Sequence, residues 1–178
     1  CFIVGAEQYS EYSGYADTFR WQGDYKDRTK KDGDQRRNCS ILAIDAQNFP
    51  NKDIQFTPKA INRELFKAFV GFYSPEGSPL SIATGNWGCG IFGGDPHLKA
   101  VLQMMAAAIC GRRLIYHTLG DKTLSQDIQE FNEFAFRAKI TVGETYELLR
   151  KYRLPSRRDQ DINVMKYLID IFRRQSSY

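Results

Sequence analysis

Short apolar runs alternate along this chain with longer segments in which apolar residues recur every three or four positions. The runs occupy residues 1–4, 40–46, 80–84 and 114–119. Runs of this length, ended by glycine or polar residues, predict β-strands. The near-continuous run at 40–46 is typical of a strand that is covered on both faces of a sheet.

The segments with helical spacing begin at residues that can satisfy the free amides of a first helical turn. A Thr-Pro pair at 57–58 and an Asp-Pro pair at 95–96 each place a capping side chain before a proline. Thr141, with Glu144 three residues later, has the pattern of a capping box. These signals and the apolar spacing predict helices over residues 58–73, 96–110, 124–139, from 141 onward, and over 161–174.

The alternation of strands with helices predicts an α/β fold that is layered around a central sheet. The helix expected at 96–110 is apolar on nearly every face, which indicates a buried helix, and Gly111 ends it. Residues 22–38 carry almost no apolar side chain and predict an exposed excursion. Residues 74–79 predict a turn, and residues 154–160 predict a polar hinge.

The composition is that of a single globular domain and excludes few functions. Of the 178 residues, 42% are apolar, which is enough to form a core. The net charge of +4 could help to attract a polyanion, but it is too small by itself to indicate nucleic-acid binding. No apolar run approaches the roughly 20 residues that span a bilayer, so no membrane association is expected.

The four cysteines are spread along the chain without the spacing of a metal site. No CxxC pair occurs, and neither His97 nor His117 neighbours a cysteine, so no zinc or other metal site is expected. The low cysteine content favours a reduced, intracellular compartment. Because the chain opens at Cys1 inside an apolar run and not at methionine, we expect the native chain to begin upstream.

The segment with the most chemical information is a glycine-rich loop at residues 85–95, between a predicted strand and a predicted helix. Five of its eleven residues are glycine, which lets backbone amides turn towards a ligand and lets that ligand approach closely. The free amides and the dipole at a helix N-terminus favour an anion. The loop therefore predicts a diphosphate site. The alternative is that these glycines only form a tight turn.

The glycines at 88, 90 and 93 also fit the G-x-G-x-x-G pattern of dinucleotide-binding loops, although that pattern alone is weak. A Rossmann loop is tight and starts its helix at the glycines. Here the Asp95-Pro96 pair is a clearer helix start, which predicts a longer loop that wraps its ligand. A Rossmann site stays open as an alternative, with Asp121 as its ribose-binding acid.

The loop and its surroundings resemble the poly(ADP-ribose) glycohydrolase family. The resemblance rests on the sequence ATGNWGCG at residues 83–90, followed by FGGD at 92–95. Further matches are EQYSEY at 7–12, GY at 14–15, QRR at 35–37, AIDA at 43–46, LKA at 98–100 and TVG at 141–143. The resemblance covers almost the whole chain, and the run around Trp87 is highly specific.

This resemblance implies a macrodomain-like, three-layer α/β/α core with additional C-terminal helices. Residues 1–178 would form the C-terminal portion of a single catalytic domain whose N-terminal portion lies upstream. Members of the family hydrolyse the ribose–ribose glycosidic bonds of poly(ADP-ribose), mainly from chain ends, and release ADP-ribose. The implied partners are this polymer and poly(ADP-ribosyl)ated proteins, in the nucleus or cytoplasm. Neither a cofactor nor direct nucleic-acid contact is implied.

The resemblance also implies a set of substrate contacts. The residues that hold the diphosphate and the distal ribose match Asn86, Trp87, Gly88, Cys89, Gly90 and Ile91. The residue matching Phe92 packs against bound substrate, and the residue matching Tyr15 lines the cleft beside Tyr12. Leu119 stands where the family often has an aromatic residue near the adenine.

The catalytic signature of the family, a Gly-Gly-Gly run followed by Gln-Glu-Glu, has no match in this chain. Glycosidic cleavage needs a carboxylic acid that protonates the leaving oxygen and then activates water. No catalytic residue is therefore assigned, and the chain by itself is expected to be inactive. Two alternatives stay open: a non-catalytic ADP-ribose-binding macrodomain module and, less favoured, a Rossmann-type NAD-dependent oxidoreductase.

Overall fold

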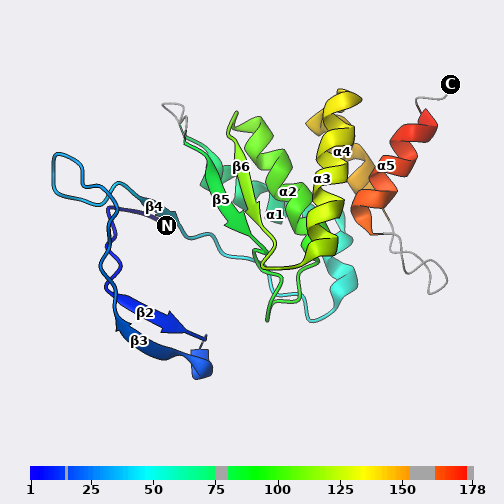
Figure 1. Ribbon diagram of the computed structural model, residues 1–178. Helices are drawn as coiled ribbons and strands as arrows, with labels where there is room; N and C mark the ends of the chain where they lie inside the picture. The colour runs from blue at the N-terminus through cyan, green and yellow to red at the C-terminus, as the bar shows by residue number, and fades with distance from the viewer. Residues whose placement is uncertain (15, 75–79, 153–162, 176–178) are drawn as a thin grey trace. The chain divides into compact units, whose positions relative to one another are not determined.

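The computed structural model describes residues 1–14, 16–74, 80–152 and 163–175 (Figure 1). The chain divides into two compact units, Cys1–Ile44 and Asp45–Tyr178, and each is described here by itself. Residues 75–79 of the expected turn at 74–79, the expected hinge at 154–160 and the predicted site residue Tyr15 lie outside the described residues. No helix in the described ranges is both long and apolar enough to cross a bilayer.

The N-terminal unit is built from two antiparallel strand pairs. Strand β1 (Phe2–Val4) pairs with β4 (Ser40–Leu42), and β2 (Ser10–Ser13) pairs with β3 (Arg20–Asp24). A short 3-10 helix, η1 (Ala16–Thr18), lies between β2 and β3. The apolar run at 1–4 was correctly predicted as a strand, whereas the β2–β3 hairpin was not predicted. Its residues are polar and aromatic without a continuous apolar run, so apolar periodicity could not reveal it.

The prediction of a buried strand over residues 40–46 is wrong in two respects. The strand ends at Leu42, and Ile41 is 49% exposed. Within the described part of the unit, β4 pairs with β1 alone, and β1 is exposed along its length. A two-stranded ribbon without a covering layer leaves its side chains accessible.

The charge-rich stretch at 22–38 is largely exposed, as predicted, but it is organised. Its first residues belong to β3, and Lys31 forms an antiparallel bridge with Arg37. The guanidinium of Arg37 donates to Glu7 and lies 3.7 Å from Asp27. The pair with Glu7 joins the stretch to the segment before β2, and the pair with Asp27 lies within the stretch. These ion pairs add to the backbone pairing of the strands in a unit that has no buried apolar residue among those described.

The C-terminal unit contains most of the regular structure. Its elements in chain order are η2 (Lys52–Phe56), α1 (Pro58–Phe72), β5 (Ile82–Gly85), α2 (Pro96–Ile109), β6 (Leu114–His117), α3 (Lys122–Arg137), α4 (Val142–Lys151) and α5 (Val164–Gln175). The strands and helices were thus predicted in the right order. The helix expected at 161–174 is described from Val164, because residues 161 and 162 lie outside the described ranges.

The helix starts follow the capping chemistry of the sequence. Thr57 accepts a hydrogen bond from the amide of Ala60 at the start of α1. Thr141 and Glu144 form the complete capping box at the start of α4. Helix α3 begins two residues earlier than predicted, because Asp121 caps it by accepting from the amide of Leu124 at 2.9 Å. Capping side chains therefore set most of these boundaries.

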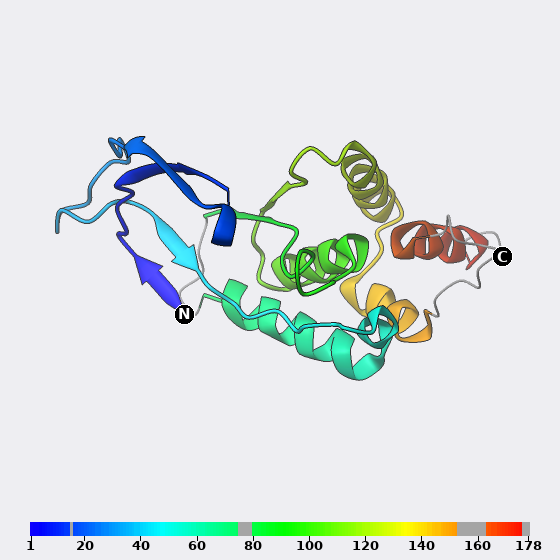
Figure 2. The same ribbon diagram turned by 90° about the horizontal axis from the view of Figure 1, so that it is seen from below.

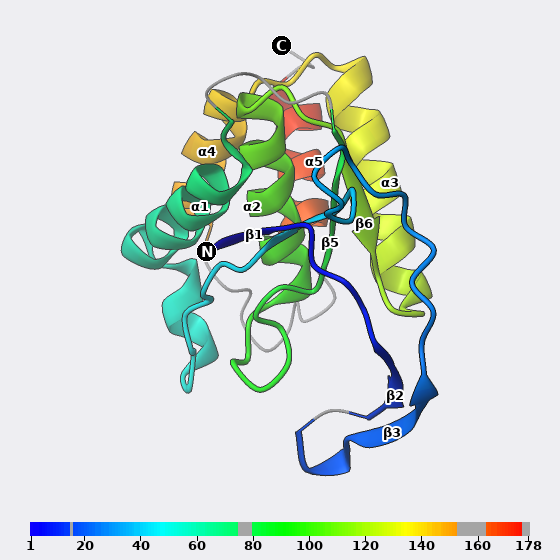
Figure 3. The same cartoon turned by 90° about the vertical axis from the view of Figure 1, so that its left-hand side faces the viewer.

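Helix α2 is the centre of the C-terminal unit. It packs against α1, α3, α4, α5 and β6, and Figures 2 and 3 show it between α1 and α3. Most of its side chains are buried, which confirms the prediction from its apolar faces. The core around it consists mainly of Phe56, Ile61, Leu98, Val101, Leu102, Met105, Phe131, Leu149, Met165, Leu168 and Phe172. A single apolar cluster thus fixes the position of the N-terminus of α2.

The two strands of the C-terminal unit run parallel, with Ile82 opposite Leu114 and Gly85 opposite His117. The chain crosses from β5 to β6 through α2, which is the β–α–β connection expected for parallel strands. Together with the helices, this arrangement confirms the α/β class. In the described residues the strands form three two-stranded pairs, two antiparallel and one parallel.

Candidate functional site

The loop at residues 85–95 leaves the carboxyl end of β5 and leads directly into α2. Ligands of α/β proteins bind at this end of parallel strands. Helix α2 starts at Pro96, after Asp95 accepts a hydrogen bond from the amide of Leu98 at 2.8 Å. The loop is therefore longer than a Rossmann turn, as the sequence predicted. Asp121, the acid that a Rossmann reading would use, caps α3 instead.

Hydrogen bonds within the loop close it into a lobe. The amide of Gly94 donates to the carbonyl of Gly88 at 2.9 Å, and the amide of Gly93 donates to Gly90 at 2.9 Å. The carbonyl of Phe92 accepts from the amide of Phe49 at 2.8 Å, which ties the lobe to the segment before η2. The lobe is thus held at its neck and at one side.

The tip of this lobe presents unused backbone donors. Among the described residues, no group accepts a hydrogen bond from the amides of Gly90, Ile91 or Phe92. All three residues are exposed, and the Ile91 side chain is 91% exposed. Successive free amides beside a helix N-terminus form a favourable place for an anion.

The glycines of the loop differ in what their missing side chains make room for. A Cβ at Gly88 would lie 2.5 Å from the Cβ of Ala46, and Gly88 has φ of +75°. A Cβ at Gly85 would lie 2.8 Å from the His117 carbonyl oxygen, and one at Gly94 would lie 2.7 Å from the Gly88 carbonyl oxygen. A Cβ at Gly90 would meet nothing within 4 Å. The tight-turn explanation therefore accounts for the neck of the loop but not for Gly90.

Asn86 is oriented by a tyrosine on the neighbouring strand. The hydroxyl of Tyr116 donates to Oδ1 of Asn86 at 3.0 Å. Burial, with smaller effects of Cys89 and Asp95, raises the pKa of Tyr116 above its ordinary value, so this hydroxyl keeps its proton near neutral pH. Within the described residues, the side-chain nitrogen of Asn86 donates to no protein group, and it is available to a ligand.

Cys89 lies in the loop but is poorly suited to nucleophilic attack. Burial, with a smaller effect of Asp95, raises the pKa of the Cys89 thiol to about 12. The thiolate is the reactive form of cysteine, so this thiol is inert near neutral pH. Its Sγ lies 3.6 Å from the Trp87 carbonyl oxygen. Cys89 therefore acts as a small packing residue.

Two residues that sequence reasoning missed lie directly beneath the loop. Lys99 and Glu64 form a buried ion pair, with 1% and 2% of their surfaces exposed. The Lys99 Nζ lies 3.9 Å from the centre of the Trp87 ring. The available signal was a lysine within an otherwise apolar helix. The glutamate could not be found, because it lies on a different helix.

Two further residues that the resemblance singled out, Tyr12 and Leu119, lie in different units. Tyr12 is on β2, is 60% exposed and stacks on Phe19 with 5.4 Å between the ring centres. Leu119, in the C-terminal unit, follows β6, is 84% exposed and has φ of +55°. The structure thus brings together residues 86–92, while Tyr12 is described within its own unit.

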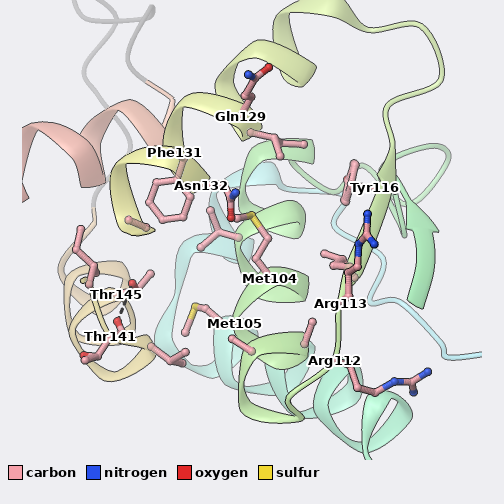
Figure 4. Close-up of a pocket in the computed structure, with 18 of the residues that line it drawn as sticks. Met104, Met105, Arg112, Arg113, Tyr116, Gln129, Phe131, Asn132, Thr141 and Thr145 are labelled. Carbon is pink, nitrogen blue, oxygen red and sulfur yellow. Dashed lines mark hydrogen bonds between the residues drawn. The ribbon is translucent and has the colours of Figure 1, made fainter. Parts of the chain in front are cut away.

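A pocket of about 670 Å³ is lined by Tyr116 and by residues of α2, α3, β6 and the start of α4 (Figure 4). Met104 and Met105 from α2 and Phe131 from α3 line it, and Arg113 lies at the start of β6. Tyr116 links this pocket to the loop through its bond to Asn86. In the described part of the chain, no three His, Cys, Asp or Glu side chains lie close enough together to hold a metal ion.

A β-strand, a glycine-rich loop with free amides and a helix N-terminus follow one another here, and this arrangement belongs to the α/β class of protein. A family model described as "Poly (ADP-ribose) glycohydrolase (PARG), Macro domain fold" matches residues 1–126. The chain belongs to this poly(ADP-ribose) glycohydrolase family. The α/β elements described above agree with the macro domain fold of the family.

Individual relatives give the same result. The chain is 34% identical over 190 residues to "Probable poly(ADP-ribose) glycohydrolase 2" of Arabidopsis thaliana, which covers 84% of this chain and 36% of the relative. It is 30% identical over 166 residues to "Poly(ADP-ribose) glycohydrolase 1" of Caenorhabditis elegans, which covers 86% of this chain and 21% of the relative. The chain thus spans well under half the length of these relatives.

Proposed function

We propose that this chain supplies the ADP-ribose-binding loop of an enzyme that hydrolyses the ribose–ribose bonds of poly(ADP-ribose). The observation that carries the proposal is the exposed lobe at residues 90–92, whose three amides have no described protein acceptor. A diphosphate offers several acceptor oxygens, and charge-assisted hydrogen bonds to backbone amides are stronger than neutral ones. Membership of the glycohydrolase family supports ADP-ribose as the bearer of that diphosphate.

In this proposal the chain binds and orients the substrate. The free amides of Gly90, Ile91 and Phe92 hold the diphosphate, and the Asn86 side chain, fixed by Tyr116, donates to it or to the adjacent ribose. Glycosidic cleavage requires a carboxylic acid, and the proposal assigns that role to no residue of this chain. Proteins that carry poly(ADP-ribose) are the partners that this chemistry would select.

Calorimetric titration with ADP-ribose tests the proposal, and NAD serves as the competing ligand. Asn86→Ala and Gly90→Val should each weaken ADP-ribose binding about tenfold or more, because each removes or blocks a donor to a charged group. Gly33→Val is the matched control. Gly33 lies in the N-terminal unit, and a Cβ there also meets no atom within 4 Å. This variant should leave the affinity unchanged.

Three outcomes would contradict the proposal. The loop assignment is wrong if both loop variants are folded and still bind ADP-ribose as the parent does. Tight NAD binding without ADP-ribose binding would favour an oxidoreductase. A native full-length protein that binds ADP-ribose but releases none from the polymer would be a non-catalytic binding module.

A further inference from the structure

Lys99 is a charged residue in the first turns of the apolar helix α2, and its side chain is buried. Its Nζ lies 3.9 Å from the centre of the Trp87 ring and 5.9 Å from that of Phe49. A cation over an aromatic face is attracted by the quadrupole of the ring. The ammonium also contacts the carboxylate of Glu64 on α1. Lys99 therefore joins α1, α2 and the glycine-rich loop at one buried point.

The side chain of Lys99 runs beneath the neck of the loop. A Cβ at Gly88 would lie 3.1 Å from its Nζ, and a Cβ at Gly94 would lie 3.1 Å from its Cε. Gly88 and Gly94 are the two residues whose hydrogen bond closes the lobe. The glycines at the neck thus leave the space that Lys99 fills, and the free amides of the tip lie just beyond it.

Lys99 belongs to a cluster of charged side chains. Glu64 contacts both Lys99 and Arg63, and Asp45 binds Arg63 and Lys67 at 2.5 Å each. Three basic side chains thus meet two carboxylates, and of the three it is Lys99 that contacts the loop. Burial, and to a smaller extent the charge of Arg63, lowers the pKa of Lys99. Direct contact with a carboxylate favours the charged form.

We propose that Lys99, held by Glu64, is a positioning residue that fixes Trp87 and the neck of the loop so that the tip amides face the diphosphate. This inference rests on the proposed function of the loop. A pair that served stability alone would need no contact with the loop. Buried ion pairs are a weak source of stability, since well-packed apolar replacements are often neutral. The contact with Trp87 and the passage under two glycines are features that a purely stabilising pair does not require.

Replacing the two charges separately and together distinguishes positioning from stabilisation. Lys99→Met removes the cation but keeps the length of the side chain, and Glu64→Gln leaves the ammonium without its carboxylate. The double variant Glu64→Gln/Lys99→Met contains neither buried charge and should regain most of the thermal stability that the single variants lose. Lys67→Met is the matched control, because Lys67 binds Asp45 without contacting the loop.

In the ligand-free protein, the chemical shift of the Trp87 indole N–H in an NMR spectrum reports the position of the loop. The chain has two tryptophans, so a Trp21→Phe background leaves Trp87 as the single source. We expect this signal to shift in Lys99→Met and in the double variant, whatever their stability. It should stay at the parental position in Lys67→Met and close to it in Lys99→Arg, which keeps a cation.

The affinity for ADP-ribose is the second measurement. Lys99→Met and the double variant should bind ADP-ribose about tenfold more weakly than the parent, a loss of the size that one cation–aromatic contact can cause. A double variant that regains stability together with the parental Trp87 signal would overturn the proposal. If the parent itself does not bind ADP-ribose, the proposed function fails, while the Trp87 signal still decides whether Lys99 positions the loop.

Discussion

Individual glycines of the loop differ in whether neighbouring atoms leave room for a side chain. Gly85, Gly88 and Gly94 are required by the close approach of neighbouring backbone or side chains. Gly90 faces open space at the tip, where a Cβ would meet no atom within 4 Å. Glycine density alone could not separate these roles. The separation depends on which atoms approach each α-carbon, and most of those atoms belong to residues distant in the sequence.

Gly88→Ala should therefore reduce stability, in contrast to Gly90→Val, which should reduce binding. The new Cβ would meet the Cβ of Ala46 at 2.5 Å, and the backbone has φ of +75°. We expect a loss of roughly 1–3 kcal/mol in the free energy of unfolding, measured by urea denaturation. Gly33→Ala is the control and should change stability by less than about 0.5 kcal/mol. Equal stabilities of Gly88→Ala and the parent would show that the neck can widen.

At the scale of elements, the starts of the helices depend on side chains that the sequence displays. The capping box of α4 is the clearest case, because the Glu144 carboxylate accepts from both the amide and the hydroxyl of Thr141. These two hydrogen bonds lower the pKa of Glu144 from its ordinary value of 4.5. A carboxyl whose pKa is lowered on folding adds stability above its unfolded pKa. That stability is lost as the pH falls through the folded value.

Glu144→Gln should isolate this contribution, since glutamine also completes a capping box but does not titrate in this range. The difference in unfolding free energy between the parent and Glu144→Gln should favour the parent near neutral pH. It should shrink as the pH falls below about 4.5. The other carboxylates titrate equally in both proteins and cancel in the difference. Denaturation at about pH 6 and about pH 3 would measure it, and a difference independent of pH would exclude the carboxylate as the cause.

The same local chemistry explains how much of the fold was predictable. Apolar spacing and caps place α1 and α2, and the start of α4, within a residue or two, because each signal lies within the element itself. The β2–β3 hairpin and the exposure of β4 were not predicted, because both depend on which strands pair and on which elements cover them. A run such as Ser-Ile-Leu is compatible with a buried or an exposed strand.

For the whole molecule, the candidate site shows the same division between local and non-local information. The glycine-rich loop could be recognised as a candidate anion site from residues 85–95, where glycines and a helix start are adjacent in the sequence. The Lys99–Glu64 pair could not, because its members are 35 residues apart and meet only through the packing of α1 against α2. The sequence therefore reveals the loop, whereas the side chains beneath it are revealed only by the structure.

The two units should also differ in how they open. All the buried apolar residues in the described ranges lie in the C-terminal unit, and Leu102 at the centre of α2 is fully buried. In the N-terminal unit, Phe2 and Ile41 are 64% and 49% exposed. Regions with few buried apolar contacts open locally at a free energy below that of global unfolding. Amides of β1 and β4 should therefore exchange with solvent faster than those of α2.

A core substitution tests whether this opening is local. Leu102→Ala should cost about 2–5 kcal/mol, because it removes buried methyl groups and leaves a cavity. Hydrogen exchange followed by mass spectrometry should then show faster exchange in α2, whose amides are released by global unfolding. The amides of β1 and β4 should exchange at their former rate, because their opening does not require the core to unfold. Equal acceleration of exchange in both units would mean that the two units unfold together. The N-terminal unit would then depend on the core of the C-terminal unit for its stability, and not only on its own strand pairs and ion pairs.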